Sequence, residues 1–166
     1  IAPEEAKEAV LRKPSLIGAL LLRMGECDAM VCGTVGKYHA HLRHVEDVIG
    51  QRADTSVFAA MNGLLLHDHT LFICDTHVNR NPSAEQLAEI ALMAANVVRR
   101  FGLVPRAALL SHSNFGSDDS ESARKMREAR RLLALRAPEL ELDGEMHGDA
   151  ALSAAIRRRV RRRCPT

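Results

Sequence analysis

The strongest constraint on the fold is an alternation of short apolar runs with longer segments of helical periodicity. The short runs are residues 29–32, 56–66, 71–74, 107–110 and 140–142. Runs of this length are typical of buried strands. The runs at 56–66 and 71–74 flank a short polar turn, which favours a neighbouring antiparallel pair. The whole alternation predicts an α/β fold, a layered domain with a mainly parallel but mixed sheet.

Helical segments fill the intervals between these runs. The helix signals are proline, serine or asparagine at the starts and glycine or proline at the ends. Asn81 and Pro82 are expected to open the clearest amphipathic helix, which ends at Gly102. The other expected helices are residues 3–12, 14–25, about 42–49, about 120–137 and 150 onward.

Composition narrows the function. Aromatic residues make up 3% of the 166 residues and tryptophan is absent, which argues against nucleic-acid modules that stack bases. The net charge is +2, and much of the positive excess lies in the arginine run at 157–163. That run is interpreted as a solvated helix face or a consequence of where the chain ends, with a nucleic-acid patch as the lesser alternative.

Cysteine usage and hydropathy indicate a cytoplasmic protein. Cys27, Cys32, Cys74 and Cys164 form no CxxC pair, and their apolar neighbours predict reduced, mostly buried thiols. The longest apolar run, residues 16–22, is too short to cross a bilayer. No membrane partner is therefore expected.

Polar loops predict a ligand site. Residues 75–81, 111–119 and 143–149 each follow an expected strand and precede an expected helix. Such loops gather at the carboxyl ends of parallel strands, where ligands bind. In the central loop the hydroxyls, amide and glycine suit an oxyanion: Ser111, Ser113, Asn114, Gly116 and Ser117. The alternative is a strand-to-helix connection capped by its own hydroxyls, and Asp118 and Asp119 would compete with a bound anion.

The remaining polar clusters have two interpretations each. His39, His41 and His44, and the pair His67 and His69, suit a metal only in part, and hydrogen-bonded or surface histidines are favoured. Asp75, Glu145 and Asp149 suit acid–base chemistry or the capping of backbone N–H groups. Arg43, at a helix start, suits phosphate or a solvated face. No metal ligand set is assigned.

Seven sequence blocks resemble the phosphate acetyl/butyryl transferase family. They run in order from Pro14 to Ile156: LLRMG at 21–25, DAMVCG at 28–33, DTHVN at 75–79, PSAEQLA at 82–88, LLSHSNFGS at 109–117, SARKM at 122–126 and DGEMHGDA at 143–150. The HSNFG and EMHGDA blocks are most similar to the transferase-like C-terminal region of bacterial NADP-dependent malic enzymes.

The resemblance implies a three-layer αβα sandwich like that of isocitrate and isopropylmalate dehydrogenases, here incomplete. It divides the chain into an N-terminal arm or helix (1–13), a partial transferase-like domain (14–156) and a divergent basic tail (157–166). The family moves acetyl groups between CoA and phosphate, and it implies acyl-CoA or phosphate binding by Arg43 and the 111–117 loop. In this stretch the resemblance implies no resident cofactor, with NADP and a divalent metal confined to a part N-terminal to it.

Two departures from the family weaken transferase catalysis. The family's catalytic Ser-Arg pair and Asp lie in a segment that would follow this chain, so no catalytic residue is assigned. Phe115 also stands where the family has a cation. The leading hypothesis is an acetyl-CoA-sensing, homo-oligomerising region of a malic enzyme that oxidatively decarboxylates malate to pyruvate. The alternatives are a phosphate acetyltransferase proper and a truncated product without a function of its own.

Overall fold

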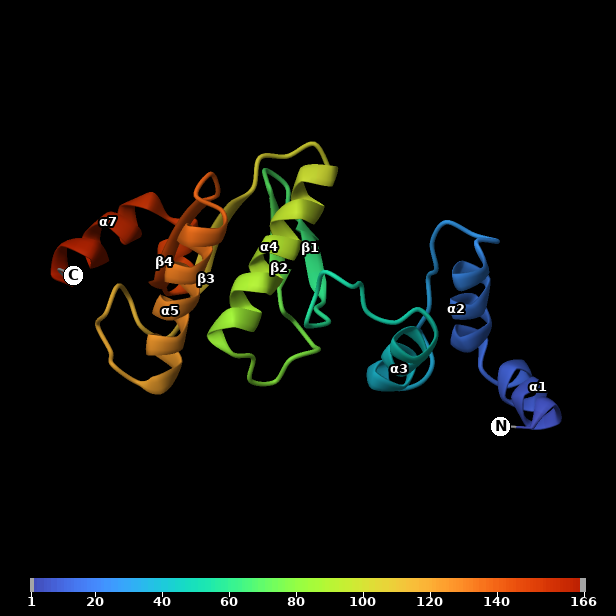
Figure 1. Ribbon diagram of the computed structural model, residues 1–166. Helices are drawn as coiled ribbons and strands as arrows, with labels where there is room; N and C mark the ends of the chain where they lie inside the picture. The colour runs from blue at the N-terminus through green and yellow to red at the C-terminus, as the bar shows by residue number, and fades with distance from the viewer. Residues whose placement is uncertain (1, 165–166) are drawn as a thin grey trace. The chain divides into compact units, whose positions relative to one another are not determined.

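The computed structural model describes residues 2–164, which form two compact units, residues 1–54 and 55–166 (Figure 1). The outermost residues of the predicted arm and tail, 1 and 165–166, lie outside the described residues. Together the two units make a mixed α/β fold with small sheets, as the alternation predicted at the level of fold class.

The first unit is helical over its described residues. It contains α1 (Pro3–Leu11), α2 (Pro14–Met24) and α3 (Tyr38–Val48). Pro3 and Pro14 occupy the first turns of their helices, where no N–H is needed. Gly25 ends α2 in the left-handed conformation at φ 78°, as the sequence predicted.

The strand expected at residues 29–32 is wrong. Residues 29–33 are irregular, and the side chains of Val31 and Cys32 are exposed. A strand needs a partner for its backbone groups, and the described part of this unit offers none. The expectation of mostly buried cysteines is wrong as well, because the other three cysteines are only half-buried. All four are free thiols.

The second unit holds two two-stranded sheets. Strands β1 (Met61–Leu65) and β2 (Thr70–Cys74) form the antiparallel hairpin predicted from the two neighbouring runs. Only the end of the 56–66 run is strand. Strands β3 (Arg106–Leu110) and β4 (Glu141–Met146) are parallel and joined through α5 (Glu121–Arg136), as expected of a βαβ crossover.

Helix α4 (Ala84–Arg100) starts two residues later than predicted. Ser83, not Asn81, is its N-cap, because Ser83 and Gln86 form a reciprocal capping box. Ser120 caps α5 as predicted, and that helix ends before Pro138. Two further helices, α6 (Gly148–Leu152) and α7 (Ala154–Arg163), complete the chain.

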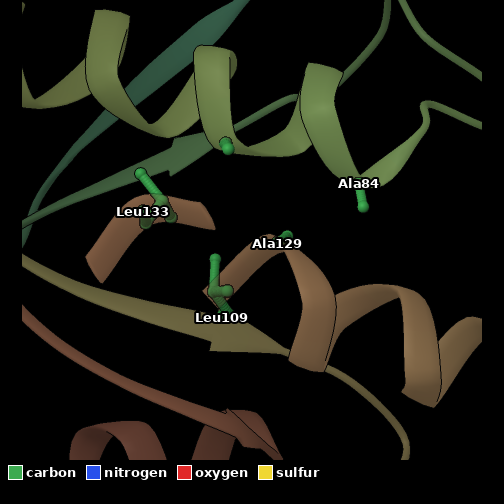
Figure 2. Close-up of a cluster of buried hydrophobic side chains, with 5 residues drawn as sticks. Ala84, Leu109, Ala129 and Leu133 are labelled. Carbon is green, nitrogen blue, oxygen red and sulfur yellow. The ribbon is translucent and has the colours of Figure 1, made fainter. Parts of the chain in front are cut away.

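The main core of this unit lies where α4, α5 and β3 meet. Figure 2 shows Leu109 of β3 and Leu133 of α5 beside alanines of both helices. Ala84, Ala88 and Ala129 are small enough to let the two helices approach closely. This core fixes the end of β3 and the body of α5, the two elements that the 111–119 loop connects.

Candidate anion-binding loop after β3

The 111–119 loop is fastened to the end of β4. The Ser111 N–H donates to the Met146 carbonyl at 2.9 Å, and the Phe115 N–H donates to the Glu145 carbonyl at 2.8 Å. The His147 N–H in turn donates to Asn114 Oδ1 at 2.9 Å. Backbone from both strands of the parallel pair therefore sets the shape of the loop.

β4 extends into the segment that the sequence assigned to a polar loop. Residues 143–146 belong to the strand, so the predicted 143–149 loop is wrong over that half. The polar composition of residues 143–146 does not indicate a strand, yet these residues belong to β4 and the last three, 144–146, are buried. A register shift in β4 opposite Leu109 and Leu110 accompanies this end of the strand.

A buried carboxylate occupies the inside of the loop. The Glu145 side chain is 1% exposed. Its Oε1 accepts from the Ser113 hydroxyl and the Gly116 N–H, each at 2.8 Å, and from Arg127 Nη1 at 3.3 Å. Burial raises the pKa of Glu145, but these donors outweigh it and hold that pKa below its ordinary value. The loop thus holds a carboxylate of the same chain, and its binding of an external anion stays a prediction.

Arg127 links this carboxylate to the acidic start of α5. Its Nη2 donates to Asp119 Oδ1 at 2.7 Å, and its Nη1 donates to the Asp118 carbonyl at 3.0 Å. Hydrogen bonds from Ser120 and His112 lower the pKa of Asp118 to about 2. Asp118 therefore stays ionised at neutral pH and places negative charge beside the loop.

Ser120, His112 and Asp118 lie within hydrogen-bond distance of one another but do not form a catalytic triad. Ser120 Oγ and Asp118 Oδ1 approach the same ring nitrogen, His112 Nε2, at 3.0 and 3.2 Å. A triad histidine needs the nucleophile and the carboxylate on opposite nitrogens. Ser120 also accepts from the Ala123 N–H as the cap of α5.

The predicted site residues fall into two groups. Ser111, Ser113, Asn114, Gly116 and Ser117 all lie in this loop, and their polar atoms make hydrogen bonds within the chain. Ser113 is fully buried, while Gly116 and Ser117 are exposed. Arg43 is exposed on α3 in the first unit, so its part in this site stays a prediction.

Asp75 has the capping role that the sequence left open. Its carboxylate accepts from the Ala60 N–H at 3.0 Å and from the Asn79 N–H at 2.6 Å. Burial raises the pKa of Asp75, but the hydrogen bonds from these backbone N–H groups outweigh that effect. The pKa of Asp75 is therefore lower than its ordinary value. The 75–81 loop, like the central loop, is organised around one carboxylate of the chain.

The histidines of the two predicted clusters are hydrogen-bonded or exposed except His44, whose Nδ1 is buried without a hydrogen-bond partner in the described part of the chain. His41 bonds to Ser15 Oγ through Nδ1 and to the Val35 carbonyl through Nε2 at 2.9 Å. His69 lies against Asp68 in the hairpin turn. Among residues 2–164 no group of three His, Cys, Asp or Glu side chains is arranged to hold a metal ion.

Sequence reasoning missed the contact between α7 and the loop. Arg161 stacks over the Phe115 ring, with its guanidinium carbon 4.6 Å from the ring centroid, and it pairs with Asp143 at 2.5 Å. Phe115 also packs with Met146, Ala150 and Ile156. The spacing of Ile156, Val160 and Cys164, each four residues apart, is the signal that marks a docked helix here.

Comparisons with known proteins agree with this architecture. The family described as phosphate acetyl/butaryl transferase matches residues 1–166. An NADP-dependent malic enzyme of Escherichia coli is 57% identical over 95% of this chain and 21% of its own length. A phosphate acetyltransferase of Nitratidesulfovibrio vulgaris is 35% identical over 95% of this chain and 22% of its own length.

The chain is also similar in structure to solved phosphotransacetylases. A phosphotransacetylase from Streptococcus pyogenes superposes with a TM-score of 0.82 at 29% identity, over 93% of this chain and 47% of that one. The EutD phosphotransacetylase from Staphylococcus aureus gives 0.79 at 27% identity, over 94% and 48%. The chain spans about a fifth of the length of the curated relatives and about half of the solved chains.

Proposed function

Because the chain belongs to the phosphate acetyl/butaryl transferase family, we propose that it is the acetyl-CoA-sensing and oligomerising region of an NADP-dependent malic enzyme. The whole protein would oxidatively decarboxylate malate to pyruvate in the cytoplasm. NADP and the divalent metal would bind outside this region. The observation that carries the proposal is the higher identity to malic enzymes than to the phosphate acetyltransferase over the same share of the chain.

The geometry of the loop supports binding over chemistry. Two of its anion donors, the Ser113 hydroxyl and the Gly116 N–H, are satisfied by Glu145. His112, the exposed base beside the loop, has its Nε2 placed against Ser120 and Asp118 rather than directed at a free nucleophile. A pre-shaped loop of this kind suits a ligand that binds and leaves unchanged.

We assign the ligand contacts to Arg43, Ser111, Ser113, Asn114, Gly116 and Ser117. In this assignment Ser113 and Gly116 hold the frame of the loop through Glu145, and exposed Ser117 faces the acyl-CoA or phosphate. Exposed Arg43, in the first unit, is proposed separately as a phosphate contact. The complete domain would be the three-layer αβα sandwich of isocitrate and isopropylmalate dehydrogenases. Residues 14–156 would be its first part, between the arm 1–13 and the basic tail 157–166.

Exposed apolar side chains support self-association. In the second unit Leu65, Val104 and Phe101 are 85%, 85% and 66% exposed. Contiguous apolar surface is typical of interaction sites, and we propose that these side chains contribute to one. Among residues 2–164 there is no helix long and apolar enough to span a membrane.

The test is a titration of the full-length protein with acetyl-CoA, in which calorimetry measures binding and an activity assay measures malate turnover. We expect saturable binding that changes turnover. The Arg43→Gln variant should weaken binding about 12- to 140-fold, because a guanidinium–phosphate contact contributes about 1.5–3 kcal/mol. Arg12→Gln, which removes an exposed arginine of the same unit, is the matched control and should bind as the parent does. No binding, or no change in turnover at saturation, refutes the proposal.

The second candidate function is a phosphate acetyltransferase proper, favoured by the solved phosphotransacetylases that superpose on this chain. Acetyl phosphate formation from acetyl-CoA and phosphate distinguishes it. Activity of the full-length protein above background would replace the sensing role with catalysis.

A further inference from the structure

Helix α7 has two faces of different character. One face packs on the second unit through Ile156, Val160 and Cys164. Arg157 and Arg161 flank this face and pair with Asp143 of β4. The positions left on the other side of the helix are all arginines apart from alanine at the first turn.

These outward positions form a cationic hollow. It has a volume of about 360 Å³ and is lined by Ala155, Arg158, Arg159, Arg162 and Arg163. All four arginines are exposed. Across residues 2–164 no carboxylate pairs with any of them, in contrast to Arg157 and Arg161 on the docked face.

Stability of α7 does not account for this arrangement. Arginines in the last turn, such as Arg162 and Arg163, complement the negative end of the helix dipole. Arg158 and Arg159 lie a turn earlier, where that effect has faded. Arg158 and Arg162 lie four residues apart, as do Arg159 and Arg163. Like charges at this spacing on a helix repel each other and destabilise it by about 0.2–0.5 kcal/mol per pair. A bound anion would remove this repulsion.

We propose that the hollow of α7 binds a soluble small molecule that carries several phosphate groups. Guanidinium groups bind phosphate through paired N–H donors, and four of them line one side of this open hollow. Arg158 and Arg163 are five residues apart, so the hollow runs about 7.5 Å along the helix axis. That length fits a short phosphate chain.

The hollow fits a small molecule better than a macromolecule. Nucleic-acid sites combine an extended basic groove with aromatic platforms. The basic face here is one short helix on a chain of net charge +2 with 3% aromatic residues. Arginine-rich membrane-surface helices need a large apolar face directed at the lipid. The apolar face of α7 is packed against Phe115 and Met146 instead.

The experiment is calorimetric titration of the full chain with inorganic tripolyphosphate. This probe has no acyl or nucleoside group, so its binding reports the hollow and not an acetyl-CoA site at the 111–117 loop. The test variant changes Arg158, Arg159, Arg162 and Arg163 to Gln. The control variant makes the same change of charge at four exposed arginines of the second unit: Arg80, Arg100, Arg130 and Arg136.

We expect saturable binding by the parent, at least about tenfold weaker binding by the test variant, and a change of about twofold or less in the control, since distant charges are screened. A variant with the four arginines changed to Lys keeps the charge and the helix. It should bind with intermediate affinity because lysine lacks the paired donors. Circular dichroism checks that α7 remains folded in each.

Three results would overturn the proposal: no binding by the parent, equal binding by the parent and the test variant, or an equal loss in the control. Duplex DNA and anionic lipid vesicles are run beside the phosphate probe. If either binds through these arginines and tripolyphosphate fails to displace it, the hollow serves a macromolecular surface and the small-molecule assignment is wrong.

Discussion

Replacement of Glu145 by Gln tests whether its buried carboxylate holds the 111–119 loop. Glutamine keeps the volume of the side chain but removes the charge and places an NH₂ group in a pocket built for an acceptor. The carboxylate accepts three hydrogen bonds, one of them from the guanidinium of Arg127. A hydrogen bond to a charged group contributes about 1.5–3 kcal/mol, and Arg127 retains Asp119 as a second partner. We expect a loss of about 2–3 kcal/mol in the local stability of the loop.

Hydrogen exchange at the Gly116 amide measures this loss directly. That N–H donates to Glu145 in the parent, so its exchange should speed up about 30- to 140-fold, at 1.4 kcal/mol per factor of ten. Glu141→Gln is the matched control, because Glu141 lies on the same strand and its ion pair with Arg106 is exposed. The control should change the exchange of Gly116 by less than about twofold, since exposed pairs contribute about 0.2–1 kcal/mol at their own position.

The pH dependence provides the second half of the test. The pKa of Glu145 is lower in the folded chain than its ordinary value of 4.5. As pH falls, the unfolded chain takes up this proton first, so the stabilisation is complete above about pH 4.5 and is lost as pH falls through the folded pKa. The parent and the Glu145→Gln variant should therefore converge below that range. Equal exchange at Gly116 in the two proteins at neutral pH, or a difference that persists at the lowest pH, would refute the role given to Glu145.

Three further substitutions test the surroundings of the loop, each by urea unfolding. Gly144→Ala should lower the free energy of unfolding by about 2–5 kcal/mol, because Gly144 has φ 121° and a Cβ there would lie 2.6 Å from the Leu109 carbonyl oxygen. The control Gly148→Ala has open space around it and should change the free energy of unfolding by no more than about 0.5 kcal/mol. Equal losses in the two variants would contradict the steric argument. Ser83→Ala should cost about 1 kcal/mol through loss of the α4 cap, and an unchanged midpoint would show that the capping box is not stabilising. Arg161→Gln should cost about 1 kcal/mol by removing the stack on Phe115 and the Asp143 pair, and no loss would mean that α7 docks through its apolar face alone.

The end of α2, the cap of α5 and the hairpin were predicted correctly from short sequence motifs, because each is determined by residues close together in the chain. The αL glycine at Gly25, the cap at Ser120 and the hairpin from the runs around 61–74 depend on contacts a few residues apart, and the structure confirms each. Helix α4 starts at the stronger of two local signals, the Ser83–Gln86 capping box rather than Asn81 with Pro82. The sequence contained both helix-start signals, and only the hydrogen bonds in the structure show which of the two begins the helix.

Non-local pairing decided the elements that were predicted wrongly. The apolar run at 29–32 has strand composition but no partner strand in its own unit. The DGEM segment has loop composition, but Asp143, Gly144 and Met146 pair with β3. Strand formation depends on what lies opposite, which a single window of sequence does not contain.

Glu145 has a role that composition could not reveal. Hydroxyls, glycine and backbone N–H groups in the 111–117 loop predicted a site for an oxyanion ligand, and in the structure two of these donors bind a carboxylate of the chain itself. Glu145 lies 32 residues after Ser113 and is brought there by the parallel pairing of β4 with β3. A loop whose strongest donors hold its own carboxylate is rigid before any ligand arrives. The proposed acyl-CoA or phosphate would therefore meet the exposed groups of the loop, such as Ser117, rather than the buried Ser113 hydroxyl that Glu145 already holds.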